Sequence, residues 1–232
     1  MVHIVGVPDC RIVLITGERQ VGKSTALQDT VKGLRSAGLH VSGLLTRRTG
    51  PHDLEVLELH TETSYLLTDP FTSAHTSVTR NFAMNADALL RSSKALETSF
   101  PTDVFVLDEI GPLELVHRQG WVSAFELLRQ EVYKLAYLIV RPELLGAAVM
   151  ELPGSGFGVI RVTLANRNIV ADRLLHVALS GKARAPGSMG SAKSSLAGSA
   201  KSSLAGSAKS SLADSAKSSL ADSAKSHEEG VV

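Results

Sequence analysis

Residues 11–24 read Arg-Ile-Val-Leu-Ile-Thr-Gly-Glu-Arg-Gln-Val-Gly-Lys-Ser, and this stretch decides the fold. Its first part, Arg11–Thr16, is a short apolar and β-branched run that stops at Gly17, which is typical of a strand buried on both faces. The following segment, Gly22–Ala37, carries apolar residues at a helical spacing, and Gly38 ends the pattern. The sequence therefore predicts a buried strand, a glycine-bounded loop and a helix in direct succession.

The loop Gly17–Ser24 fits the pattern G-x-x-x-x-G-K-[ST] of a phosphate-binding P-loop in full. Its two glycines allow a close backbone approach that a Cβ would block, so the loop amides can converge on phosphate oxygens at the positive end of the helix. Lys23 can reach the β- and γ-phosphates, and the Ser24 hydroxyl can bind magnesium. We expect the nucleotide to contact Gly17, Glu18, Arg19, Gln20, Val21, Gly22, Lys23, Ser24 and Thr25.

A second buried strand, Asp103–Leu107, stops at the acidic pair Asp108–Glu109. A P-loop needs a metal partner, normally an acid at the end of another buried strand, and Asp108 fills that place. Asp108 and Ser24 are therefore the predicted ligands of Mg²⁺, with Asp108 acting through water. Glu109 can orient and deprotonate a water for in-line attack on the γ-phosphate, which makes it the predicted general base.

Charge on the transferring phosphoryl group must also be neutralised. Arg141 follows the predicted strand Ala136–Val140, and by analogy with related folds that strand lies between the P-loop strand and the acidic strand. Arg141 is therefore expected at the γ-phosphate, the alternative being an arginine packed on the surface. Arg19 and Arg167 are further candidates for this role. Glu114 either supports the site from behind or faces solvent, and the sequence leaves both open.

The rest of the chain alternates strands and helices, which predicts a mostly parallel sheet covered on both faces. Further strands are expected at Val41–Thr46 and Val159–Thr163, a hairpin at Leu54–His60 and Ser64–Thr68, and helices at Asn81–Leu96, Trp121–Tyr133 and Asn168–Leu179. In the first of these helices, Asn85 or Asp87 is expected near the start. We expect a three-layer α/β sandwich of the P-loop type. With the five core strands numbered along the chain, the expected order is 5-1-4-3-2, extended at one edge by the hairpin.

Composition separates a domain at residues 1–186 from a tail at residues 187–232, which contains four octapeptides of the type SAKSSLAG or SAKSSLAD. A repeat of eight advances about 80° beyond two helical turns, so its leucines would spiral around a helix without forming a seam. With so few apolar groups, the tail is predicted to be disordered. A weak interaction tail is the alternative.

The charge balance gives no electrostatic case for nucleic acid or an anionic membrane as a partner. Five of the 24 basic and four of the 23 acidic residues lie in the tail, so 19 of each remain in the domain. Cys10 is the one cysteine, no apolar run is long enough to span a bilayer, and Met1–Arg11 lacks the pattern of a secretory signal. A cytoplasmic protein is expected.

These motifs resemble the THEP1 family of P-loop nucleoside triphosphatases. Asp108–Leu115 reads D-E-I-G-P-L-E-L and is similar to that family's DEIG-x-[ML]-EL signature. Gly43–Thr46 resembles its G-F-Y-T strand, and Val162–Thr163 with Asn166–Arg167 resembles its V-T-x-x-N-R segment. The agreement in order and spacing covers roughly Arg11–Leu179 and leaves out the tail.

The resemblance implies magnesium-dependent hydrolysis of ATP, GTP and other nucleoside triphosphates to the diphosphate and phosphate, with Glu109 carrying the hydrolysis. It also implies that the nucleotide site includes Leu107, Asp108, Glu109, Ile110, Gly111, Pro112, Leu113 and Glu114. The chain departs from the family in Arg47–Thr49 and in Glu18–Gln20, which leaves base preference open. Two alternatives remain: a phosphotransferase acting on a small acceptor, and a nucleotide-gated regulatory or assembly module. A protein partner is not indicated by the sequence.

Overall fold

The computed structural model describes residues 5–6, 10–70, 82–154 and 156–180. The chain divides into two units, Met1–Gly190 and Ser191–Val232, and every described residue belongs to the first. The repeat tail, with its predicted disorder and its boundary at residue 187, lies outside the described residues. In the described part of the chain, no helix is long and apolar enough to cross a membrane.

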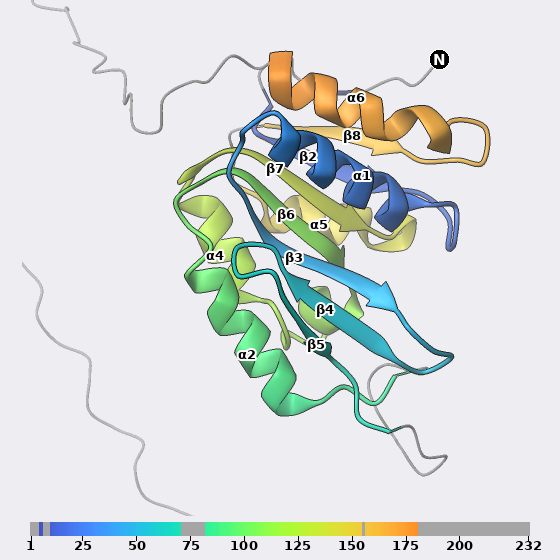
Figure 1. Cartoon of the computed structure of the whole chain (residues 1–232), viewed down its shortest axis with the longest axis vertical. Helices are drawn as coiled ribbons and strands as arrows, with labels where there is room; N and C mark the ends of the chain where they lie inside the picture. Colours follow the sequence, from blue (N-terminus) through green and yellow to red (C-terminus); the bar gives the residue numbers. More distant parts are fainter. Residues whose placement is uncertain (1–4, 7–9, 71–81, 155, 181–232) are drawn as a thin grey trace, which may run out of the picture. The chain divides into compact units, whose positions relative to one another are not determined.

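Strands and helices alternate along most of the first unit (Figure 1). The strands are β1 (Val5–Gly6), β2 (Ile12–Thr16), β3 (Val41–Arg48), β4 (Leu54–Glu58), β5 (Thr63–Leu66), β6 (Thr102–Ile110), β7 (Tyr133–Val140) and β8 (Phe157–Arg161). The helices are α1 (Lys23–Ser36), α2 (Ala86–Glu97), α3 (Pro112–Leu115), α4 (Ser123–Arg129), α5 (Leu145–Glu151) and α6 (Arg167–Ser180), with a short 3₁₀ turn, η1, at Pro142–Leu144.

The strands form one sheet with the order β1-β8-β2-β7-β6-β3-β4-β5. The five strands from β8 to β3 run parallel, and their order is the one expected from the sequence. The hairpin of β4 and β5 extends the β3 edge in antiparallel fashion, also as expected. The sequence did not predict β1, a two-residue strand antiparallel to β8.

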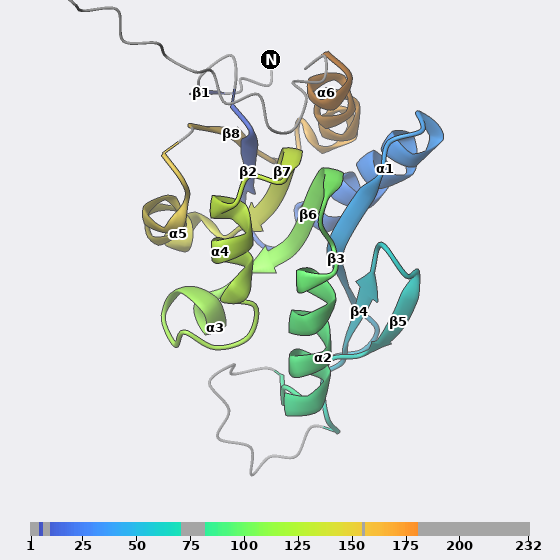
Figure 2. The same cartoon turned by 90° about the vertical axis from the view of Figure 1, so that its left-hand side faces the viewer.

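Helices cover both faces of the sheet, which gives the expected three-layer α/β sandwich (Figure 2). On one face, Leu27 and Leu34 of α1 and Leu174 of α6 pack against the sheet. On the other face, the apolar side chains of α2, α4 and α5 form a second core with the sheet. Strand β2 is buried along its whole length because both layers cover it. The loop that follows it is therefore attached to the most rigid part of the fold.

The predicted helix Trp121–Tyr133 was too long at both ends. Helix α4 spans only Ser123–Arg129, and Glu131 adopts a left-handed conformation with φ 51°. Tyr133 then begins β7, and its buried ring donates a hydrogen bond of 3.0 Å from its hydroxyl to Leu128 O. The apolar spacing fitted a helix, but its last positions pair with the sheet, because tertiary packing overrides a short periodic pattern.

Other boundaries also moved. Helix α2 begins at Ala86, because the Asn85 side chain accepts a hydrogen bond of 2.8 Å from Ala88 N and so caps the helix. Asn85 is one of the two residues expected near the helix start. Residues 82–85 are not helical, and Asn81, the first residue of the predicted range, lies outside the described residues. Strand β6 continues past Leu107 to Ile110 and so includes the acidic pair. The sequence analysis did not predict α3 or α5, which are only four and seven residues long.

Candidate active site

The P-loop joins the end of β2 to the start of α1, at the edge of the sheet where the parallel strands end (Figure 1). Gly17 has φ 145°, and a Cβ at this residue would lie 2.3 Å from the carbonyl oxygen of Val162. Gly22, the residue before α1, has φ 103°. Both positions are in a conformation that L side chains rarely adopt, so the two glycines of the motif are required by the backbone itself.

Lys23 turns back over the loop that precedes it. Its Nζ donates hydrogen bonds of 2.8 Å to Gly17 O and of 2.8 Å to Glu18 O, and the residue is only 9% exposed. The ammonium group is therefore held against the backbone of the loop. A phosphate bound by the loop amides would lie next to this charge.

Ser24 and Asp108 are brought together from α1 and β6, 84 residues apart in the sequence. The Ser24 hydroxyl donates to Asp108 Oδ1 over 3.2 Å. Asp108 is 1% exposed, and its second oxygen, Oδ2, has no hydrogen-bond partner among the described residues. Burial, and to a smaller extent the nearby Glu109 carboxylate, raises the pKa of Asp108 to about 7, although the Ser24 hydroxyl opposes this shift. The positive charge of Lys23 also acts against the shift but does not outweigh the burial.

Glu109 is paired with Arg141 at the same edge of the sheet. Arg141 Nε lies 3.1 Å from Oε1 of Glu109, and its Nη2 lies 3.2 Å from Oε2, so the contact is bidentate. The side chain of Arg141 is 25% exposed and that of Glu109 is 28% exposed. Arg141 follows β7, and β7 lies between β2 and β6, as expected by analogy with related folds. Arg141 is thus a partly buried residue that pairs with Glu109 at the end of the expected strand.

A pocket of about 320 Å³ lies beside the loop. It is lined by Gly17, Glu18, Arg19, Arg141, Pro142 and Glu143. The two arginines of this lining come from the P-loop and from the end of β7. Arg167, the third arginine considered, is not in this lining, and its Cδ lies 3.7 Å from the place that a Cβ on Gly22 would take. Arg19 and Arg141 are therefore the arginines that share a pocket.

Glu114 does not face solvent. It is 4% exposed, its Oε2 accepts a hydrogen bond of 3.0 Å from Gly111 N, and its Oε1 accepts one of 3.3 Å from Trp121 N. Burial raises its pKa, while the amides of Gly111 and Trp121 act in the opposite direction. The sequence could not reveal the contact with Trp121, because it depends on how the segment after α3 folds back.

Several residues expected to line the site have their side chains in the core. Leu107 and Ile110 are 0% exposed and Leu113 is 8% exposed. Val21 of the P-loop also belongs to the core between the sheet and α1. A contact from these residues to a nucleotide would have to come from the backbone. Sequence analysis also missed Thr16, whose buried Oγ1 at the end of β2 has no hydrogen-bond partner among the described residues.

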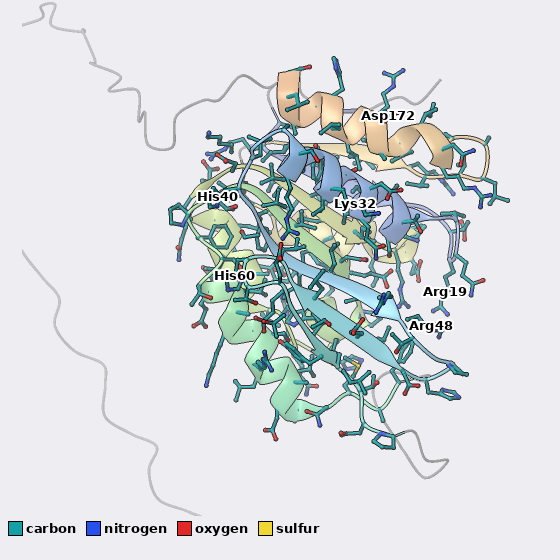
Figure 3. The ribbon with its side chains drawn as sticks, in the orientation of Figure 1. Arg19, Lys32, His40, Arg48, His60 and Asp172 are labelled. Atoms are coloured by element: carbon teal, nitrogen blue, oxygen red, sulfur yellow. The ribbon has the colours of Figure 1, made fainter. Side chains whose placement is uncertain are left out.

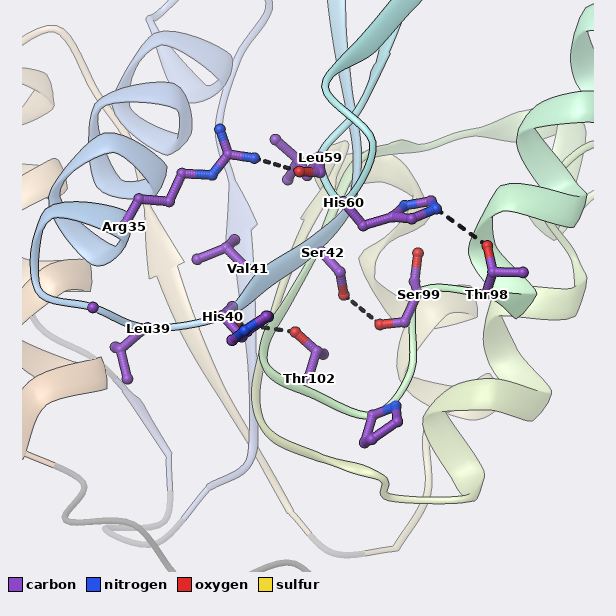
Figure 4. A pocket seen from close by; sticks show the side chains of 12 residues that line it. Arg35, Leu39, His40, Val41, Ser42, Leu59, His60, Thr98, Ser99 and Thr102 are labelled. Atoms are coloured by element: carbon purple, nitrogen blue, oxygen red, sulfur yellow. Dashed lines mark hydrogen bonds between the residues drawn. The ribbon is translucent and has the colours of Figure 1, made fainter.

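A larger pocket, of about 490 Å³, lies at the opposite edge of the sheet, where β3 and β6 begin (Figure 4). Figure 3 shows the separation: Arg19 and Arg48 lie at the end of the molecule near the P-loop, and His40 and His60 lie at the other end. The polar groups of this pocket largely satisfy one another, as in the contacts of Ser42 with Ser99 and of His60 with Thr98. This pocket is therefore not part of the P-loop site.

Comparison with known proteins gives the family. A family model described as NTPase matches residues 12–175, which run from β2 into α6 and include every site residue described above. The chain belongs to this NTPase family. The nucleoside-triphosphatase THEP1 of Methanopyrus kandleri is 28% identical over 173 residues, which cover 70% of this chain and 92% of the relative. The family resemblance to THEP1 that the motifs indicated is confirmed.

The fold of this NTPase is also found in a solved structure. The crystal structure of THEP1 from the hyperthermophile Aquifex aeolicus matches with a TM-score of 0.52 and 18% identity, covering 72% of this chain and 98% of the solved one. The match confirms a P-loop α/β fold. The family and its named relative together identify the chain as a nucleoside-triphosphatase, an enzyme that binds nucleotides and hydrolyses them.

Proposed function

We propose that this NTPase hydrolyses ATP, GTP and other nucleoside triphosphates to the diphosphate and phosphate in a magnesium-dependent reaction. The observation that carries the proposal is the contact between Ser24 and Asp108, which joins the P-loop to the acidic end of β6. Glu109, the next residue, contacts Arg141, which lines a pocket together with Gly17 and Glu18 of the loop that would hold the phosphates. A protein that only binds nucleotides does not need a carboxylate base at this place.

The donor set fits Mg²⁺. Among the described residues, no group of three or more His, Cys, Asp or Glu side chains could hold a metal ion, so a dedicated protein cage is not found there. Magnesium in such enzymes is instead held by one or two protein oxygens together with phosphates and waters. Ser24 Oγ and the unpartnered Oδ2 of Asp108 supply such oxygens. The ion would neutralise the charge on the bound phosphates.

The side chains around the loop divide the remaining work. Lys23, whose ammonium group contacts the carbonyls of Gly17 and Glu18, exchanges these partners for phosphate oxygens. Glu109 accepts a proton from the attacking water, and Arg141, now beside it, neutralises charge that develops on the γ-phosphoryl group. Arg141 lines the pocket next to the loop and also contacts Glu109, so it can interact with both the phosphate and Glu109.

The test is a phosphate-release assay over ATP, GTP, CTP and UTP, with and without Mg²⁺. Lys23→Ala should lose both binding and turnover. Glu109→Gln should keep nucleotide binding and lose most phosphate release, because the amide cannot take the proton. Unchanged turnover in Glu109→Gln would remove Glu109 from the mechanism, and equal turnover without the metal would refute the magnesium dependence.

A phosphotransferase is the second candidate, and the pocket lined by Arg19 and Arg141 favours it, because two arginines beside the P-loop could receive a small acceptor. The same assay separates the two functions when diphosphate and phosphate are both measured. A hydrolase forms them in equal amounts. A phosphotransferase forms diphosphate without phosphate once a nucleoside or another suitable acceptor is added.

A further inference from the structure

We propose that Glu114 is a positioning residue. It holds Glu109 in place by binding the backbone at both ends of the segment that joins β6 to α4. The inference rests on the proposed function of Glu109. It replaces the expected contact between Glu114 and the nucleotide with an indirect role.

The carboxylate of Glu114 is enclosed by its own segment. It accepts the amide of Gly111, at the start of the segment, and that of Trp121, near its end. Gly120 has φ 69°, and a Cβ there would lie 2.5 Å from Oε1 of Glu114. The chain therefore closes tightly around the carboxylate. Both oxygens are engaged by backbone amides, so Glu114 is occupied as a structural acceptor.

Glu109 needs such support because the sheet does not hold it directly. The pairing of β6 with β7 is regular up to Leu107 and resumes at Ile110, with a shift of register in between. Glu109 lies inside this interruption, and Gly111 is two residues further on. Fixing the Gly111 amide therefore restrains the backbone immediately after Glu109. Loss of that restraint would let the carboxylate of Glu109 move relative to the phosphate site.

The other end of the segment is anchored to the body of the protein. Trp121 is 3% exposed, and its Nε1 donates a hydrogen bond of 2.8 Å to Oγ of Ser92, a fully buried residue of α2. The connection runs from α2 through Trp121 and Glu114 to Gly111. The carboxyl group of Glu114 has two oxygens, so it can accept a hydrogen bond from each amide. Glutamine has only one acceptor oxygen and would turn its NH₂ group toward the other amide. Glu114→Gln thus breaks one of the two contacts with almost no change in volume.

The experiment is a double-mutant cycle with Glu114→Gln and Glu109→Gln, using ATP hydrolysis and ATP binding as readouts. A misplaced catalytic group commonly costs about 100-fold in rate, so we expect Glu114→Gln alone to lower kcat by roughly 10- to 100-fold. The dissociation constant of ATP, measured in the Glu109→Gln background, should change less than about twofold. In that background Glu114→Gln should also leave the residual kcat unchanged, because residues that act as a unit are not additive.

Glu58→Gln is the matched control. Glu58 is another buried glutamate, 5% exposed, whose carboxylate accepts hydrogen bonds from Tyr65 and Thr61 at the hairpin. If Glu58→Gln loses about as much stability as Glu114→Gln but keeps a normal kcat, destabilisation by itself does not lower the rate. Amide hydrogen exchange gives a readout independent of activity: Gly111 should exchange faster in Glu114→Gln and at the wild-type rate in Glu58→Gln.

The outcomes are distinct. Three results for Glu114→Gln would each overturn the positioning role. They are a kcat within about twofold of wild type, an equal loss of rate in the Glu109→Gln background, and weaker ATP binding in place of slower turnover. If Glu114→Gln does not fold, Trp121→Phe, which keeps an aromatic ring but loses the bond to Ser92, takes its place in the cycle. A wild-type enzyme without ATPase activity would refute the role of Glu109 instead, and exchange at Gly111 would still decide whether Glu114 holds the segment.

Discussion

Replacing Gly43 by alanine tests the close approach of β3 to β6. Gly43 lies in β3 with φ 107°, and a Cβ at this position would be 1.9 Å from the carbonyl oxygen of Val106 in β6. Both atoms belong to the backbone of paired strands, so neither can move like the end of a flexible side chain. The clash must therefore be relieved by separating β3 from β6 or by twisting one of them.

The cost can be worked from these two features. A left-handed conformation costs a non-glycine residue about 1–2 kcal/mol, and forcing extra volume into a packed interior costs about 1–3 kcal/mol. The free energy of unfolding should thus fall by about 2–5 kcal/mol, which for a domain of this size lowers the melting temperature by roughly 10 °C. Because Val106 is two residues before Asp108, phosphate release should fall as well.

Thermal unfolding followed by circular dichroism measures the first effect. Gly146→Ala is the control, because Gly146 lies in α5 with no atom within 4 Å of a Cβ, and alanine there should stabilise the helix by about 0.5–1 kcal/mol. A Gly43→Ala protein that melts within about 2 °C of wild type would refute the reasoning, since it would show that the two strands separate at almost no cost.

Four further predictions follow from single contacts. Arg141→Ala should lower kcat for phosphate release roughly 100-fold, because Glu109 loses its partner and the phosphoryl group loses a positive charge; a change in KM alone would contradict this. Asp108→Asn should raise the magnesium concentration needed for half-maximal rate about tenfold or more, measured by metal titration with ATP held constant. Glu58→Gln should reduce the free energy of unfolding in urea by about 2 kcal/mol, because its buried carboxylate loses charged hydrogen bonds to the hairpin. Asn85→Ala should cost about 1 kcal/mol in the same measurement through loss of the cap of α2, whereas Asn85→Asp should cost less.

The sequence determined the central part of the fold because its signals there are local and agree with one another. Arg11–Ser24 combines a buried strand with glycines that the backbone needs, and the structure shows that a Cβ at Gly17 would collide with Val162. The strand before Asp108 is marked by its uniform apolar run. These elements end at one edge of a parallel sheet, which is why the contact of Ser24 with Asp108 could be expected.

The elements that sequence analysis missed are short or depend on distant partners. Helix α3 has four residues and owes its position to Glu114, whose second contact, Trp121, is supplied by a later turn of the chain. The predicted end of α4 was wrong because Tyr133 belongs to strand β7. The apolar character of Tyr133 fits both a helix and a strand and does not distinguish between them. The pairing of Glu109 with Arg141 likewise needs the strand order before it can be seen.

The position of Lys23 bears on how strongly the enzyme holds its ligands. The ammonium group makes two hydrogen bonds of 2.8 Å to carbonyl oxygens of the loop, so a phosphate that binds Lys23 replaces these acceptors and does not simply add a new one. The net affinity therefore reflects the difference between carbonyl and phosphate as acceptors. The reverse exchange takes place when the product leaves. Lys23 then returns to the carbonyl oxygens of Gly17 and Glu18, so its charge is not left without hydrogen-bond acceptors. The carbonyls of Gly17 and Glu18 thus compete with a bound phosphate for Lys23, which favours release of the product.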